Sequence, residues 1–266
     1  MLTNPRSDRV KAVRALSRRS ARSRTGLFLA EGPQAVREAV RCRPELVRDV
    51  FVTAEAAARH RPIVEVAAAA GLAVSEVTPE VLAAMCDTES PQGLAAVCRP
   101  VDVPLQRAVA ALPPAGLVCV LTHVRDPGNA GTVIRGADAA GADLVVVSDA
   151  SVDVHSPKVV RSTAGSLFHV PVVVGVPVAA ILAALRDAGV ALLAADGAGP
   201  TLLPEVDLRR AHAWVMGNEA WGLLPEVRDA CDEVVRVPIY GRAESLNLAM
   251  AATLCLYASA EARRST

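Results

Sequence analysis

The chain has 266 residues, of which 52% are hydrophobic and 21% charged, and its formal net charge is zero. This composition indicates a globular protein of one large or two ordinary domains, and it argues against a disordered chain or a globally basic nucleic-acid binder. The six cysteines are scattered without a C-x-x-C pair, which predicts reduced thiols in the cytoplasm and no metal site. The N-terminus lacks an apolar signal region, and the longest apolar run is interrupted by Pro171, Gly175 and Pro177, so neither export nor a membrane span is expected.

The first 24 residues form a strongly basic segment. It contains eight lysines and arginines and only one acidic residue, Asp8. Such an arm suits a polyanionic partner, and the alternative is a tail that only keeps the protein soluble.

Short apolar stretches alternate with helical ones over residues 25–99. After the strand and helix of "GLFLAEGPQAVREAVR", further strands are predicted in "DVFVTAE", "GLAVSEV" and "GLAAVCRP", with helices at 54–70 and 79–86. This pattern predicts a small α/β domain of about 75 residues. The proline-containing passage 100–115 is the predicted linker between this domain and the C-terminal half of the chain.

From residue 116 to 266 the pattern changes to continuous apolar runs separated by helices. Six strands are predicted, in "GLVCVLTHV", "ADLVVVSD", "HVPVVV", "VALLAAD", "HAWVMG" and "EVVRVPI". Runs without period-two alternation predict a mostly parallel sheet that is covered on both faces. Because ligands of such sheets bind beyond the carboxyl ends of the strands, the loops after these strands are the candidate functional places.

The first of these loops is "RDPGNAGTVIRGADAAGAD", after the strand that ends near His123. Its glycines permit a close turn, and Thr132 could begin a helix. If Arg135 lies one turn into that helix, its guanidinium could reach back toward Asn129. The loop does not match G-x-G-x-x-G, which argues against a nicotinamide dehydrogenase.

Two later loops carry polar residues at strand ends. In "MGNEAWGLLPEV", Gly217 would let the backbone approach a ligand, and Glu219 is either functional or a cap of the next helix. In "GRAESLNLAMAATLCLY", Ser245 is the predicted N-cap of the final helix. Asn247 is not needed for that cap, so it is either a tolerated surface residue or faces a group that needs an amide.

Together the three loops resemble the motifs of the SpoU/TrmH family of RNA ribose 2'-O-methyltransferases in the SPOUT superfamily. "NAGTVIRGADAAGAD" is similar to the first motif, "GNEAWGL" to the second and "VPIYGRAESLNLAMA" to the third. The resemblance covers residues 116–261. The preceding unit is similar to the L30e-like substrate-binding domain of that family, through "FLAEG" and "SPQGLAAV".

The resemblance implies an α/β trefoil-knot methyltransferase domain at 116–266, which binds S-adenosyl-L-methionine and pairs as a homodimer, preceded by an L30e-like RNA substrate-binding domain at 25–99 and the basic arm at 1–24. It implies that Asn247 holds Arg135 and the substrate. The implied catalytic residues are Asn129, Arg135, Glu219, Ser245 and Asn247. The implied cofactor-binding residues are Leu193, Gly197, Gly217, Asn218, Val237 and Leu246.

The implied reaction methylates a ribose 2'-hydroxyl, most simply in 23S ribosomal RNA, and the basic arm would contact that RNA through Arg18, Arg19, Arg22 and Arg24. A transfer RNA substrate, a non-catalytic RNA-binding module of the same fold and a base-methylating relative are the alternatives. Because the pKa of a guanidinium lies above roughly 12, Arg135 is better suited to grip the RNA phosphate and polarise the 2'-oxygen than to act as a general base.

Overall fold

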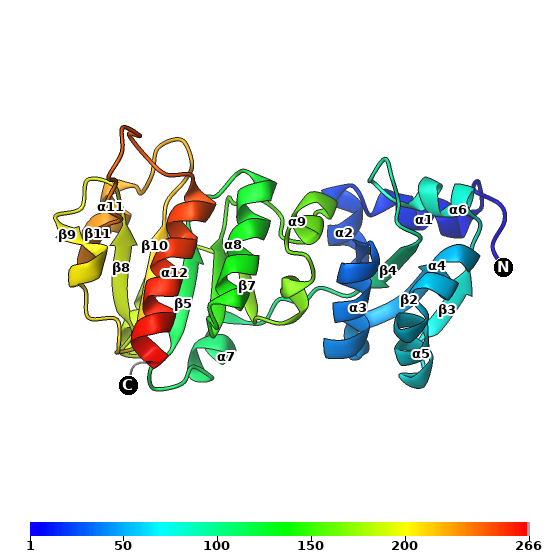
Figure 1. Ribbon diagram of the computed structural model, residues 1–266, viewed down its shortest axis with the longest axis horizontal. Helices are drawn as coiled ribbons and strands as arrows, with labels where there is room; N and C mark the ends of the chain where they lie inside the picture. The colour runs from blue at the N-terminus through cyan, green and yellow to red at the C-terminus, as the bar shows by residue number, and fades with distance from the viewer. Residues whose placement is uncertain (265–266) are drawn as a thin grey trace. The chain divides into compact units, whose positions relative to one another are not determined.

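The computed structural model describes residues 1–264 and divides them into two units (Figure 1). The first unit contains Met1–Val101 and, from much later in the chain, Asp153–His169. The second contains Asp102–Val152 and residues 170–264. The continuous domain predicted from residue 116 is therefore interrupted, because residues 153–169 fold with the first unit.

The first unit is built on a four-stranded mixed sheet in the order β1-β4-β2-β3. Strand β4 is antiparallel to both β1 and β2, and β2 is parallel to β3. All four strands were predicted from their apolar stretches, and their bounds are β1 Phe28–Glu31, β2 Val47–Val52, β3 Ala73–Glu76 and β4 Leu94–Cys98.

Helices α1 and α6 share a hydrophobic core with this sheet, in which Val10 and Val13 meet Leu82 and Met85. The predicted helix 54–70 is two helices that part at His60, because Pro62 suits the start of a helix and not its interior. The helix bounds are α1 Asp8–Ala15, α2 Arg19–Thr25, α3 Pro33–Cys42, α4 Ala54–Arg59, α5 Arg61–Ala69 and α6 Pro79–Met85, with a short 3-10 turn η1 at Pro44–Leu46.

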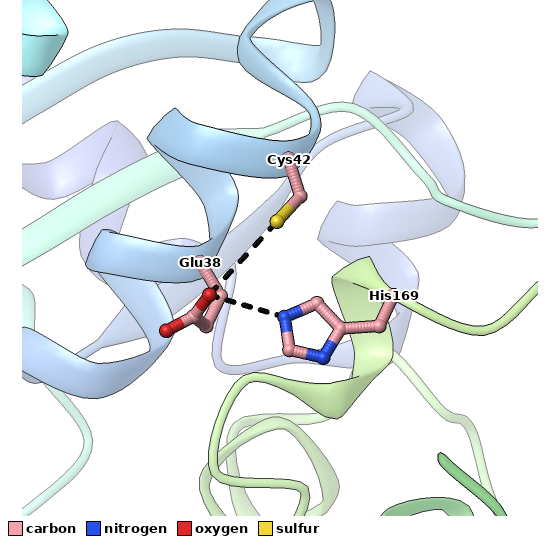
Figure 2. A group of neighbouring side chains, drawn as sticks. All are labelled: Glu38, Cys42 and His169. Atoms are coloured by element: carbon pink, nitrogen blue, oxygen red, sulfur yellow. Dashed lines mark hydrogen bonds and ion pairs between the residues drawn. The ribbon is translucent and has the colours of Figure 1, made fainter. Parts of the chain in front are cut away.

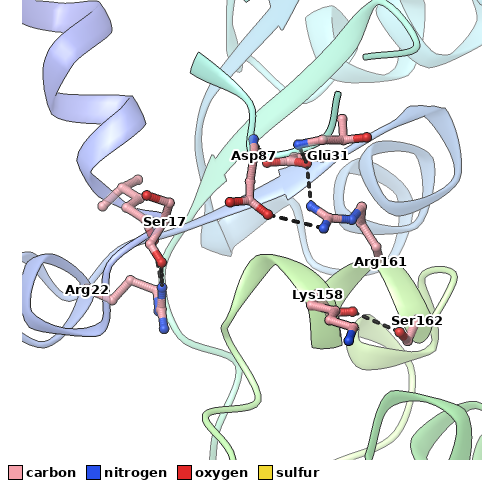
Figure 3. A network of polar contacts seen from close by, with 9 residues as sticks. Ser17, Arg22, Glu31, Asp87, Lys158, Arg161 and Ser162 are labelled. Atoms are coloured by element: carbon pink, nitrogen blue, oxygen red, sulfur yellow. Dashed lines mark hydrogen bonds and ion pairs between the residues drawn. The ribbon is translucent and has the colours of Figure 1, made fainter. Parts of the chain in front are cut away.

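The inserted segment 153–169 completes the core of the first unit. It contains helix α9 (Pro157–Ser162) and the 3-10 turn η2 (Ser166–Phe168), and α9 packs against β1. The ring of Phe28 in β1 stacks on Phe168 with centroids 6.1 Å apart. The buried Glu31 carboxylate accepts hydrogen bonds from the Arg161 guanidinium at 2.8 Å and from the backbone N–H of Asp87 at 2.7 Å (Figure 3). A charge in the interior is thereby paired, and loop 86–93 is anchored to the insert.

A second polar contact joins the insert to helix α3. His169 Nε2 lies 3.1 Å from Glu38 Oε2, and Cys42 lies one helical turn beyond Glu38 (Figure 2). Burial raises the pKa of Glu38, but hydrogen bonds from Arg37 and His169 outweigh it and leave the pKa below its ordinary value. We interpret this group as a tether that fixes the end of the insert on α3.

The second unit is a seven-stranded sheet in the order β7-β6-β5-β10-β8-β11-β9, and all its neighbouring pairs are parallel. Six of its strands were predicted. Strand β9, with only two residues, was missed because it is too short to show a pattern. The strand bounds are β5 Leu117–Leu121, β6 Leu144–Ser148, β7 Val172–Val176, β8 Ala191–Ala195, β9 Thr201–Leu202, β10 His212–Met216 and β11 Glu233–Arg236.

Helices cover this sheet on both faces. Val118 in β5 and Leu192 in β8 point into one core with residues of α7, α10 and α11, whereas α8 and α12 lie side by side on the opposite face (Figure 1). The bounds are α7 Leu105–Ala110, α8 Pro127–Ala139, α10 Val178–Asp187, α11 Pro225–Asp229 and α12 Leu248–Arg264, with the 3-10 turn η3 at Leu203–Glu205. The predicted linker 100–115 thus contains α7, which is buried in the core through Leu105 and Ala108.

A buried polar group fixes α12 on the sheet. The Ser259 hydroxyl accepts a hydrogen bond from Trp214 Nε1 at 2.8 Å and lies 2.7 Å from His212 Nε2, while His212 Nδ1 donates to the Arg210 carbonyl at 2.7 Å. Burial lowers the pKa of His212, so a neutral imidazole is favoured here.

Candidate functional site

A cavity of about 910 Å³ opens at the carboxyl ends of β8, β10 and β11, where the topology of a parallel sheet predicts a ligand. Its walls come from the loops after these three strands and from the start of α12. Five of the six residues predicted to hold the cofactor line it, namely Gly197, Gly217, Asn218, Val237 and Leu246. The sixth, Leu193, is buried within β8 and does not line the cavity, because it precedes the carboxyl end of that strand.

Two glycines of the cavity have different reasons to be glycine. A Cβ on Gly217 would lie 2.3 Å from the backbone of Gly222, so this glycine allows its loop to fold closely on itself and does not make room for a ligand. A Cβ on Gly197 would have no atom within 4 Å. The space beside Gly197 therefore belongs to the cavity.

The first loop begins its helix earlier than predicted. Helix α8 starts at Pro127, with Asp126 as its N-cap and the Asp126 carboxylate accepting from the Asn129 backbone N–H at 2.7 Å. Thr132 lies inside the helix. The Asp-Pro pair is a local helix-start signal, and it outweighs the later threonine.

The second loop is tied to the first through Glu219. Its carboxylate accepts hydrogen bonds from the backbone N–H groups of Arg125 and Asp126, each at 3.1 Å, and from Asn129 Nδ2 at 3.3 Å. Glu219 thus organises the loop before α8 and does not cap the next helix along the chain, α11.

The third loop joins the other two through Asn247. Asn247 Nδ2 donates to Asn129 Oδ1 at 3.0 Å, and Asn247 Oδ1 accepts from the Ala249 backbone N–H at 2.9 Å. Asn247, and not Ser245, therefore caps α12. Ser245 lines the cavity as an exposed residue, and no hydrogen bond of its side chain is found within residues 1–264.

The hydrogen bonds of this asparagine chain have one possible direction. An ionised Glu219 can only accept, so Asn129 must turn its amide nitrogen to Glu219 and its oxygen to Asn247. Asn247 must then turn its nitrogen to Asn129 and its oxygen to the start of α12. Three loops that are distant in sequence are thereby fixed to one another at the mouth of the cavity.

Arg135 stands apart from this chain. It lies on the exposed side of α8, and the structure of residues 1–264 gives its guanidinium neither a hydrogen bond nor an ion pair. The prediction that Asn247 holds Arg135 is therefore wrong for this structure. Arg135 follows Asn129 by six residues, which turns its side chain about 240° around the helix axis. This turn explains why Arg135 does not meet Asn129.

Two further side chains stabilise the loops that form the cavity wall. Asn218 was predicted to bind the cofactor, and Thr122 was not singled out in the sequence. The buried Asn218 side chain donates to the His123 carbonyl at 2.6 Å and accepts from the Ala220 N–H at 2.8 Å. Thr122 Oγ1 donates to the Met216 carbonyl at 2.8 Å. Asn218 thus supports the cavity wall with its side chain and also with its backbone N–H, which donates to the Gly222 carbonyl.

In the first unit, the predicted basic arm is folded and not a tail. It forms α1 and α2, and Val10, Val13 and Leu16 are buried. Arg22 is also buried: its guanidinium donates to Asp153 at 2.6 Å and to the Leu16 carbonyl. It also donates to the Ser17 carbonyl (Figure 3). The predicted RNA contact by Arg22 is therefore corrected to a structural role, whereas Arg18, Arg19 and Arg24 are exposed.

The parallel sheet, the cavity at its carboxyl edge and the three linked loops define an α/β protein that is shaped to hold a small ligand beside a polar mouth. The family model of the SpoU rRNA methylase family matches residues 116–257, and that of the MRM3-like substrate binding domain matches residues 7–96. The chain belongs to the SpoU rRNA methylase family.

Relatives match over nearly the whole chain. The 23S rRNA guanosine 2'-O-methyltransferase RlmP of Bacillus subtilis is 33% identical over 96% of this chain and 97% of its own. Among solved structures, an AdoMet-bound rRNA methyltransferase from Sinorhizobium meliloti has a TM-score of 0.85 at 31% identity, covering 99% of this chain and 97% of its own. The SpoU methyltransferase AviRb of Streptomyces viridochromogenes, in complex with AdoMet, has a TM-score of 0.84 at 31% identity, covering 98% and 100%. Within residues 1–264, no helix combines the length and apolarity that a membrane crossing needs.

Proposed function

We propose that this protein transfers a methyl group from S-adenosyl-L-methionine to a ribose 2'-hydroxyl of 23S ribosomal RNA, and so acts in the cytoplasm. The observation that carries the proposal is the chain Glu219–Asn129–Asn247, which joins the three motif loops at one cavity mouth. Family membership and full-length relatives that carry 23S rRNA methyltransferase names support it.

The cavity suits the cofactor in size and chemistry. Its volume of about 910 Å³ lies at the upper end of the range for small-ligand pockets, which is about 300–1,000 Å³. Gly197, Val237 and Leu246 would border the adenosine, and the backbone of Gly217 would offer hydrogen bonds, while Asn218 would hold the Gly217 loop in place. When bound, the cofactor supplies an electrophilic methyl group, and the chain's task is to hold the ribose in line with it.

Arg135 and Ser245 are the residues proposed to meet the RNA at the reacting end. The exposed Arg135 guanidinium, which has no partner among residues 1–264, is available to a phosphate, for which its planar fork is well suited. Gripping the phosphate next to the reacting ribose would also stabilise negative charge as it develops on the 2'-oxygen. The Ser245 hydroxyl would add a second hydrogen bond from the cavity side.

We also propose a homodimer through α12. Met250, Leu254 and Tyr257 follow one another at helical spacing and are 45–61% exposed, so they form an exposed apolar stripe along α12. A monomer mass in light scattering at micromolar concentration would contradict it. The trefoil knot stays a prediction of the family resemblance.

The test of the proposed function has two arms. Calorimetry should detect S-adenosyl-L-methionine binding to the purified protein, and the protein should methylate 23S rRNA from a strain that lacks the gene, at a ribose position identified by mass spectrometry. Cofactor binding with transfer only to transfer RNA would favour the tRNA alternative. RNA binding without cofactor binding would favour the non-catalytic alternative, and a methyl group on a base would favour the base-methylating one.

A further inference from the structure

The few aromatic residues of this chain are distributed unevenly. There are seven, of which Phe28, Phe51, Phe168 and Trp214 are fully buried. Of the remaining three, Trp221 is 53% exposed and Tyr240 92% exposed, and both line the cavity. Exposing large aromatic rings to water is unfavourable, so two exposed rings at one cavity mouth indicate a surface that binds a ligand.

Trp221 is presented on a rigid turn. Asn218 and Gly222 exchange two backbone hydrogen bonds, of 2.8 and 2.9 Å, and the Asn218 side chain anchors the turn to the His123 carbonyl. Gly217 packs directly against the backbone of Gly222. An exposed ring on a braced turn loses little conformational freedom when it binds, which is what a preformed stacking surface needs.

Tyr240 comes from the loop after β11, which also carries Ser245 and the cap residue Asn247. The cavity is therefore bordered by two aromatic rings from two loops, and the same two loops carry Glu219 and Asn247, the two ends of the asparagine chain. Arg242, which is exposed and has no ion-pair partner within residues 1–264, adds positive charge to the Tyr240 loop.

We propose that Trp221 and Tyr240 form a stacking platform for an unpaired nucleobase of the RNA, at or beside the methylated nucleotide. The proposal rests on the proposed function, since it adds a base-binding surface to the same site. Aromatic rings combined with arginine are the usual means of holding single-stranded RNA. The flat face of a base is accessible to a ring in a single strand, whereas in a duplex it is covered by the neighbouring base pairs. Both rings line the cavity that is proposed to hold the cofactor, so a base stacked on them would lie next to the cofactor.

The chain offers a direct spectroscopic test. It contains two tryptophans, and Trp214 is buried beneath α12, so the change in fluorescence on RNA binding comes from Trp221. A short single-stranded oligoadenylate should quench the fluorescence of the full-length protein, and a blunt duplex of equal length should not. Trp221→Phe should abolish the quenching while keeping most of the affinity, because phenylalanine still stacks.

Removing either aromatic side chain should weaken binding of the single strand and not of the duplex. Trp221→Ala and Tyr240→Ala should each weaken binding about tenfold, the size of one missing base–aromatic stack, and Tyr240→Phe should restore it. Equal affinity in Trp221→Ala and wild type, or equal quenching by the duplex, would overturn the proposal. So would a loss confined to cofactor binding in calorimetry, which would assign the indole to the cofactor, or a fall in molar mass, which would assign it to a second copy. Quenching by single strands without methyl transfer in wild type would remove the proposed enzyme activity and leave the platform standing.

Discussion

The asparagine chain predicts different outcomes for two substitutions at one position. Asn247 performs two tasks, accepting from Ala249 N–H as the cap of α12 and donating to Asn129 Oδ1. Asn247→Ala removes both. Asn247→Asp keeps an acceptor at the positive end of the helix but turns a second oxygen toward Asn129 Oδ1, so only the link to Asn129 is lost.

The stability losses reflect these two tasks. Losing an N-cap costs about 1 kcal/mol, and losing an exposed neutral hydrogen bond costs about 0.5 kcal/mol. Asn247→Ala should therefore lower the free energy of unfolding by about 1.5 kcal/mol, and Asn247→Asp by about 0.5 kcal/mol or less. Ser245→Ala, which changes the cap residue predicted from the sequence, should alter it by less than about 0.5 kcal/mol. Urea unfolding followed by tryptophan fluorescence measures all three variants.

Methyl transfer should separate the two tasks again. Since both variants break the link between the loops, both should slow single-turnover transfer, although Asn247→Asp is nearly as stable as wild type. Equal destabilisation by Asp and Ala would show that capping is not what Asn247 contributes. A wild-type transfer rate in Asn247→Asp would show that the link to Asn129 and Glu219 is not needed for catalysis.

Three further predictions concern single residues or small groups. Arg135→Ala should leave cofactor affinity unchanged and lower the rate of methyl transfer by roughly 10² or more, and Arg135→Lys should rescue little of that rate. The losses of Arg135→Ala and Asn247→Ala should add because the two side chains do not touch, and single-turnover assays with labelled methyl groups measure all of these rates. Replacing the exposed Arg18, Arg19 and Arg24 by glutamine should reduce the slope of log affinity for RNA against log salt concentration by about 0.7 for each phosphate contact that is removed. The same change at the exposed control residues Arg48, Arg59 and Arg61, on another part of the first unit, should leave the slope unchanged. Filter binding over a salt series measures both slopes. Because burial lowers the pKa of His212 in the folded state, the unfolded chain takes up its proton first as pH falls; stability should therefore decline below pH ~6.5, more steeply in wild type than in His212→Gln, and an equal pH dependence of the melting temperature in both would contradict this.

The strands could be predicted because their signal is local. Runs such as "LVCVL" and "LVVVS" are apolar at every position, and no other structure buries such runs as well as a covered parallel sheet. The motif loops were recognised from their residues, and five of the six residues that were predicted to bind the cofactor line the cavity.

The features that could not be predicted depend on partners far along the chain. Ser245 and Asn247 are both good cap residues two positions apart, and the contact with Asn129, which lies 118 residues earlier, favours the second. Arg22 looks like any surface arginine until Asp153, 131 residues later, is placed beside it. No local pattern in 153–169 indicates that this segment belongs with the first unit.

That insertion also determines how the protein can be taken apart. The chain passes between the two units at residues 101–102, 152–153 and 169–170, so no single cut yields both of them whole. A fragment that ends at Val101 would keep Arg22, Phe28 and Glu31 and lack Asp153, Phe168 and Arg161, leaving two buried charges unpaired and an aromatic ring bare. Exchanging the substrate-binding module with that of a relative therefore requires two grafts, the N-terminal hundred residues and the matching insert, made together.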